Sequence, residues 1–143
     1  MTYLLIFIYL LILIYASYID IVTRKVPSCV ILSIIILAIT KMIIDFSIIN
    51  IIYNVIGSIV IFSIFLVPNF IKDGAIGGGD IKFMSSSTLF LGLEKIIIST
   101  IIALSMMIII ELIKNIKNKK HINNLKCALV PYLSLGCFFS LLI

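Results

Sequence analysis

Long, nearly uninterrupted apolar segments separated by short polar breaks constrain this chain more than any other feature. A helix that spans a lipid bilayer needs roughly 20 apolar residues, and most of the segments meet or approach that length. They are continuously apolar, without the alternation of a membrane barrel strand. The sequence therefore predicts an all-α, polytopic membrane protein in which residues 1–143 form a single domain with six transmembrane helices. The segments cover about residues 3–19, 28–44, 51–70, 81–93, 96–113 and the C-terminal end.

Composition and charge exclude several other classes of protein. The chain is 63% hydrophobic, whereas a soluble domain averages roughly 45–50% apolar residues. The net charge of +5 comes from cations in the short breaks, which form no basic stripe of the kind that binds nucleic acid. The three cysteines form no C-x-x-C pair and the only histidine is His121, so we expect neither a metal site nor another cofactor. No basic region precedes the first apolar run, which we interpret as a retained helix rather than a signal peptide.

The positions of the cations predict the orientation in the membrane. If the first, third and fifth breaks share one side, that side carries nine of the eleven Lys and Arg residues, and only Lys41 and Lys95 lie on the other. Cytoplasmic loops carry such an excess. We therefore expect the breaks that hold Asp20 and Asp80 to be cytoplasmic and both termini to be extracytoplasmic. The fourth segment is short and rich in Ser, so neighbouring helices or a water-filled cavity should shield it from lipid.

Two of the six acidic residues, Asp20 and Asp80, stand at segment ends on this cytoplasmic side. An ionisable group at a membrane boundary is costly unless it is paired or functional. Taken singly, Asp20 could pair with Arg24, and Asp80 could be an ordinary N-cap. Taken together, they arrive on the same side at similar depth from different helices. The other four acidic residues are assigned solvated or capping roles: Asp45, Asp73, Glu94 and Glu111.

Two carboxylates that meet can activate water for peptide hydrolysis. The ionised one takes a proton from water, and the protonated one polarises the scissile carbonyl. Asp80 opens a helix, where the dipole favours negative charge, and Asp20 ends one, where it does not. The sequence therefore predicts catalytic roles for both, and the dipoles favour Asp80 as the general base with Asp20 as the protonated partner. Arg24 and Lys25 act in the other direction on Asp20, so which of the two is the general base stays open.

Three consecutive glycines, Gly77, Gly78 and Gly79, precede Asp80. Glycine permits backbone angles that other residues avoid, so the chain can turn tightly into the next helix. Without side chains, these residues also let an extended substrate strand approach and pair with the backbone. We expect all three to bind substrate.

These two motifs resemble those of a known family. Residues 18–27, Tyr-Ile-Asp-Ile-Val-Thr-Arg-Lys-Val-Pro, followed by residues 77–82, Gly-Gly-Gly-Asp-Ile-Lys, are similar to the signatures of the type IV prepilin peptidases. These are aspartic membrane peptidases of the GxGD type, related to archaeal preflagellin peptidases. Residues 126–136 resemble the family's last-helix motif. Ser28 stands where the family often has Asn, and Ala128 stands near a position where it often has Pro.

The resemblance implies an aspartic endopeptidase with a GxGD-type core, and it adds a substrate to the prediction. That substrate is a prepilin-like protein of a type IV pilus or secretion system, with a short basic leader and an N-terminal hydrophobic helix. The cut falls after the leader, commonly after a glycine, at the cytoplasmic membrane face. The chain has no cysteine-rich insertion of the kind associated with methylation in long members, so the resemblance implies a short form limited to peptidase activity. Membrane lipid is the other expected partner, and the oligomeric state stays open.

Two other readings remain open. In the first, the chain is a non-catalytic membrane assembly component in which the two aspartates are structural. In the second, it is a small ion or proton transporter that uses the aspartates as a relay. A relay needs ionisable groups deeper in the membrane, and the segment interiors hold almost none. The transporter is therefore the weaker alternative.

Overall fold

The computed structural model describes residues 2–71, 76–118 and 129–142, and these residues form helices and no strand. The all-α prediction is confirmed, and helices stand at the six apolar segments. Their bounds are α1 (Thr2–Thr23), α2 (Ser28–Asp45), α3 (Ile48–Ile71), α4 (Gly78–Leu91), α5 (Leu93–Asn118) and α6 (Val130–Leu142).

Four helices are long and apolar enough to cross a membrane. They are α1, α2, α3 and the Leu93–Ile113 part of α5. α4 has 14 residues and α6 has 13. At 1.5 Å per residue, each measures about 20 Å, against an apolar bilayer core of about 30 Å. The chain is thus a membrane-embedded helical protein with four candidate spans, and the six-span arrangement stays a prediction.

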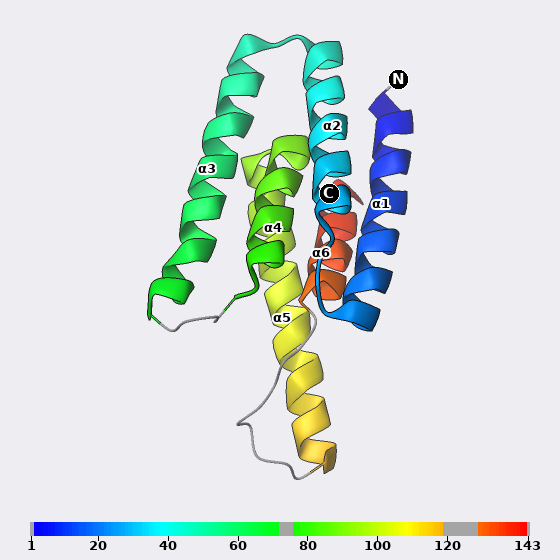
Figure 1. Cartoon of the computed structure of the whole chain (residues 1–143), viewed down its shortest axis with the longest axis vertical. Helices are drawn as coiled ribbons and strands as arrows, with labels where there is room; N and C mark the ends of the chain where they lie inside the picture. Colours follow the sequence, from blue (N-terminus) through cyan, green and yellow to red (C-terminus); the bar gives the residue numbers. More distant parts are fainter. Residues whose placement is uncertain (1, 72–75, 119–128, 143) are drawn as a thin grey trace.

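α4 occupies the interior of the helix bundle. It packs against α2 and α3 and also contacts α5 and α6 (Figure 1). Ser86, Ser87 and Thr88 of α4 are buried. Two of them donate to carbonyls of the same helix: Ser86 Oγ to Phe83 O at 2.9 Å and Thr88 Oγ1 to Met84 O at 2.7 Å. The shielding predicted for this polar segment is confirmed.

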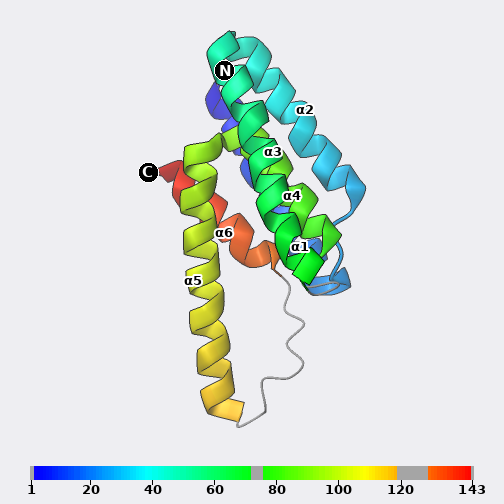
Figure 2. The same cartoon turned by 90° about the vertical axis from the view of Figure 1, so that its left-hand side faces the viewer.

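The chain breaks between helices use residues that suit them. Pro27, at the N-cap of α2, has φ of −68° and supplies a rigid start. Gly92 separates α4 from α5 at φ of +92°, a conformation that side chains disfavour. As a result, the end of α1, the start of α4 and the start of α6 lie at one end of the bundle, and the α2–α3 connection lies at the other (Figures 1 and 2).

Candidate active site

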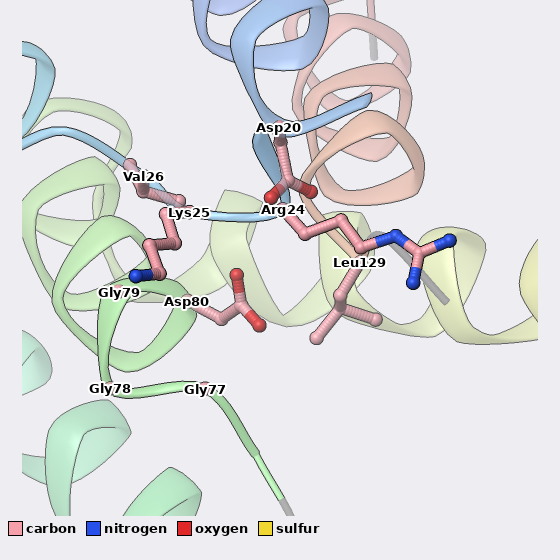
Figure 3. Close-up of a pocket in the computed structure, with 9 residues that line it drawn as sticks. All are labelled: Asp20, Arg24, Lys25, Val26, Gly77, Gly78, Gly79, Asp80 and Leu129. Carbon is pink, nitrogen blue, oxygen red and sulfur yellow. The ribbon is translucent and has the colours of Figure 1, made fainter. Parts of the chain in front are cut away.

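A cavity of about 310 Å³ opens where α1 ends and where α4 and α6 begin. The close-up in Figure 3 shows the Asp20 and Asp80 side chains entering it from α1 and α4. Both predicted catalytic residues and all three predicted glycines therefore come together. The lining residues are Asp20, Arg24, Lys25, Val26, Gly77, Gly78, Gly79, Asp80 and Leu129.

Asp20 lies in the last turn of α1 and is only 4% exposed. Its Oδ2 accepts a hydrogen bond of 3.2 Å from the backbone N–H of Val130, the first residue of α6. The first N–H groups of a helix lack partners within the helix and carry partial positive charge, so they stabilise an adjacent anion. The N-terminus of α6 therefore offsets the unfavourable end of α1 and favours the ionised form of Asp20, whereas burial of the side chain acts more strongly in the opposite direction.

The turn after Asp20 is held by its own backbone. The Arg24 N–H donates to Asp20 O at 2.9 Å, and Arg24 adopts a left-handed conformation with φ of 53°. Such a conformation costs a non-glycine residue about 1–2 kcal/mol, so the turn must be stabilised by its surroundings. The Thr23 hydroxyl lies 2.9 Å from Ile19 O and 3.0 Å from Lys25 O, which ties the end of α1 to the turn.

Asp80 lies in the first turn of α4, and its backbone N–H donates to Gly77 O at 3.0 Å. Burial, followed by the charge of Asp20, raises the pKa of Asp80 from 3.8 to about 6, although a hydrogen bond from the Gly77 backbone lowers it. Asp80 is half-buried and faces the cavity (Figure 3). Its protonated form is therefore present in the pH range where an ordinary aspartate is ionised.

The three glycines differ in what surrounds them. A Cβ on Gly77 would stand 3.0 Å from Oδ2 of Asp80, and one on Gly79 would stand 3.1 Å from Cβ of Val26. A Cβ on Gly78 would meet nothing within 4 Å. None of the three has a left-handed backbone; Gly77, for example, has φ of −61°. Our expectation of a glycine-only conformation was therefore wrong: Gly77 and Gly79 provide space for neighbouring groups, and only Gly78 leaves an open surface.

Several neighbours of the two aspartates had no functional role in the sequence analysis. Arg24 and Lys25 were interpreted as orientation signals, with Arg24 also a possible partner of Asp20, and both line the cavity. The roles of Val26, Leu129 and the N–H of Val130 depend on contacts between distant segments. The local sequence around these residues therefore does not predict them. Among the described residues, no group of three or more His, Cys, Asp and Glu side chains could hold a metal.

The other acidic residues lie apart from this cavity or outside the described residues. Asp45 ends α2 and Glu94 begins α5, at the opposite end of the bundle. Glu111, expected to be solvated or capping, is instead buried in α5 at 8% exposure. Asp73, for which we also expected a solvated or capping role, lies outside the described residues.

Comparison with known proteins points to a family rather than to an individual relative. No curated protein and no solved structure matches the chain. The model of the type IV leader peptidase family matches residues 7–112, which include both aspartates and the three glycines. Because this match covers about three quarters of the sequence, the chain belongs to the type IV leader peptidase family.

Proposed function

We propose that this chain is an aspartic endopeptidase that cleaves the basic leader of prepilin-like membrane proteins, using water activated between Asp20 and Asp80. The observation that carries the proposal is the meeting of these two carboxylates, sixty residues apart, in one cavity where burial and the charge of Asp20 raise the pKa of Asp80. The family match supports peptide hydrolysis as the reaction class. The cut is made at the cytoplasmic membrane face.

In this mechanism Asp20 is the general base and Asp80 the general acid. Burial disfavours the ionised form of both carboxyl groups. The N–H of Val130, from a second helix, acts against burial at Asp20, whereas the charge of Asp20 adds to the effect of burial at Asp80. This assignment reverses the one predicted from sequence. That prediction considered only the helix that carries each residue, and it omitted the N-terminus of α6.

The proton transfers balance over one cycle. Asp20 takes a proton from water as the water oxygen attacks the scissile carbonyl carbon, and Asp80 gives its proton to the carbonyl oxygen. The carbon–nitrogen bond of the tetrahedral intermediate then breaks. Asp20 returns its proton to the leaving nitrogen, and Asp80 recovers a proton from the hydroxyl oxygen, so both carboxyl groups regain their starting states.

The open surface at Gly78 suits an extended substrate strand, because a backbone can approach there without meeting a side chain. Arg24 and Lys25 line the same cavity, so their charge offers no attraction for a basic leader. We propose that recognition depends on the substrate's apolar helix, which stays in lipid and presents the cut site at the end of the bundle. Backbone pairing near Gly78 then fixes the scissile bond.

The proposal includes one orientation for the whole chain. Residues 1–143 form one transmembrane domain with a GxGD-type core, in which the four candidate spans and the shorter α4 and α6 together cross the membrane six times. Both termini are extracytoplasmic. The distribution of cations supports this, since Arg24 and Lys25 lie beside the aspartates and Lys41 lies near the opposite end of α4.

The experiment compares wild type with Asp20→Asn and Asp80→Asn in proteoliposomes. The substrate carries a short basic leader that ends in glycine, followed by an apolar helix. Each variant should lose at least ~10²-fold in cleavage rate, the scale of general acid–base catalysis. Thermal unfolding is measured in parallel. If Asp80→Asn cleaves the substrate at the wild-type rate, the proposal is overturned. If both variants fail to fold, the result instead favours a structural role for the aspartates in a non-catalytic assembly component.

A further inference from the structure

The two helices that carry the aspartates are not packed closely along their lengths. α1 packs mainly against α6 and α2, whereas α4 packs mainly against α3 and α2. Packing between α1 and α4 therefore cannot by itself set the height of Asp80 relative to Asp20, that is, their relative positions along the axis of the helix bundle. Tyr9 of α1 and Phe90 of α4 provide a direct contact: their rings stack with centroids 4.4 Å apart and an interplanar angle of 21°, and both side chains are fully buried.

The position of this stacked pair matches that of the aspartate pair. α1 and α4 run in opposite directions (Figure 1). Tyr9 lies eleven residues before Asp20, and Phe90 lies ten residues after Asp80. At 1.5 Å per residue, these separations are about 16 Å along α1 and about 15 Å along α4. Stacking at one end therefore brings the two carboxyl groups to nearly the same height at the other.

Lys41 of α2 holds Phe90 in two ways. Its Nζ donates to Phe90 O at 2.7 Å and lies 4.9 Å from the centroid of the Phe90 ring. A lysine within an apolar helix is expensive unless it has a partner. The last carbonyls of α4 need donors, because the helix ends at Leu91 within the bundle. Asp45 and Lys95 are the charged groups near Lys41.

We propose that Tyr9, Phe90 and Lys41 form a register clamp that sets the height of Asp80 relative to Asp20 and so positions the two carboxyl groups for cleavage. This inference rests on the proposed function. The clamp touches no substrate, because it lies at the other end of α4 from the cavity. Its residues are positioning residues. A misplacement of about 1 Å between reacting groups can cost up to ~10²-fold in rate, and a slip of one helical residue is 1.5 Å.

The first test measures kcat and KM of purified Lys41→Met on the leader substrate. Methionine keeps a long apolar side chain but donates no hydrogen bond to Phe90 O. We expect kcat to fall about 10-fold, within the range for small misplacements, and KM to change less than about 2-fold. Lys41→Arg keeps a cationic donor and should recover at least half of the lost rate. Lys95→Met is the matched control, because it replaces a lysine at the same end of the bundle. This variant should cleave the substrate at the wild-type rate.

The second test is independent of catalysis. In a chain with Cys29, Cys127 and Cys137 changed to Ser, Asp20→Cys and Asp80→Cys are combined, and the rate of disulfide formation is measured. Adding Lys41→Met or Tyr9→Leu should slow cross-linking several-fold, whereas adding Lys95→Met should not. Unchanged cross-linking in both clamp variants overturns the inference, as does a Lys41→Met enzyme with wild-type kcat. If wild type fails to cleave but the clamp variants still slow cross-linking, the proposed function fails and the clamp stands.

Discussion

Gly79→Ala tests whether the turn after α1 is held against the first turn of α4. The added Cβ would stand 3.1 Å from Val26 Cβ and 3.4 Å from both Val26 Cγ2 and its backbone N. Ordinary contacts between such atoms lie at 3.5–4.0 Å, so Val26 must retreat by several tenths of an ångström. Because Val26 belongs to the turn that the Arg24–Asp20 backbone hydrogen bond fixes, its retreat moves Asp20 away from Asp80.

The expected effect on catalysis is larger than the effect on stability. Overpacking costs about 1–3 kcal/mol, but alanine is favoured over glycine within a helix by about 0.8–1 kcal/mol. The net loss of unfolding free energy for Gly79→Ala is therefore roughly 0–2 kcal/mol. Displacement of one carboxyl group should lower kcat by about 10–100-fold. Gly78→Ala makes the same propensity gain without a clash, so its thermal midpoint should rise.

The assay measures kcat on the reconstituted leader substrate and the thermal midpoint of each purified variant. Val26→Ala removes Cγ2 and lets Cβ withdraw, so the double variant with Gly79→Ala should recover part of the lost kcat. A double-mutant cycle gives the coupling between the two positions. If Gly79→Ala retains the wild-type kcat, or if Val26→Ala recovers none of the loss, this contact does not position the aspartates.

Three further predictions follow from the same structure. The pKa of Asp80 is about 6, so kcat/KM should fall as the pH rises through 6, and a rate that keeps rising to pH 8 would contradict the acid role of Asp80. An ordinary aspartate, as in the unfolded chain, has a pKa of 3.8, so between 3.8 and about 6 the folded chain binds more protons than the unfolded chain. The folded chain therefore loses stability as the pH rises through this range. The thermal midpoint of Asp80→Asn should accordingly rise relative to that of wild type from pH 4 to pH 7, and a lower midpoint than wild type at pH 7 would contradict this. Gly136→Ala places a Cβ against the backbone oxygen of Ser99 in α5, so it should lower the thermal midpoint, while Gly78→Ala does not.

The helices could be predicted from sequence because each apolar run is bounded by polar, glycine or proline residues. The predicted segment 28–44 agrees with α2 to within one residue. The ends of α1 and α5 extended further than predicted, because polar residues continue a helix when its backbone hydrogen bonds can continue. The burial of α4 also followed from its polarity. Its end at Leu91, two residues before the predicted end, is set by Gly92. The partner of Phe90 O could not be predicted, since it is Lys41 in another helix.

The candidate site was predictable where a charge stood out against an apolar background. Asp20 and Asp80 were identified because an ionisable group at a membrane boundary is costly unless it is paired or functional. The distribution of cations also predicted that both lie on the same side of the membrane. The surroundings of the glycines were not predictable, because the space beside Gly79 is defined by Val26, more than fifty residues earlier. The proposed protonation roles differ from the predicted ones for the same reason: the prediction judged each carboxyl group by its own helix and omitted the N-terminus of α6.

The N-terminus of α6 resolves how two chemically identical side chains come to differ. Asp20 receives a backbone N–H from Val130, 110 residues later in the chain, and the dipole of a second helix adds to that bond. Among the described residues, Asp80 receives a hydrogen bond from its own turn, at Gly77, and this bond does not offset burial and the neighbouring negative charge. A negative charge on Asp20 therefore favours a proton on Asp80, and the opposite arrangement would leave the α6 N–H beside a neutral acid. The packing of α6 against α1 thus supports the proposed assignment, in which Asp80 holds the proton before substrate arrives.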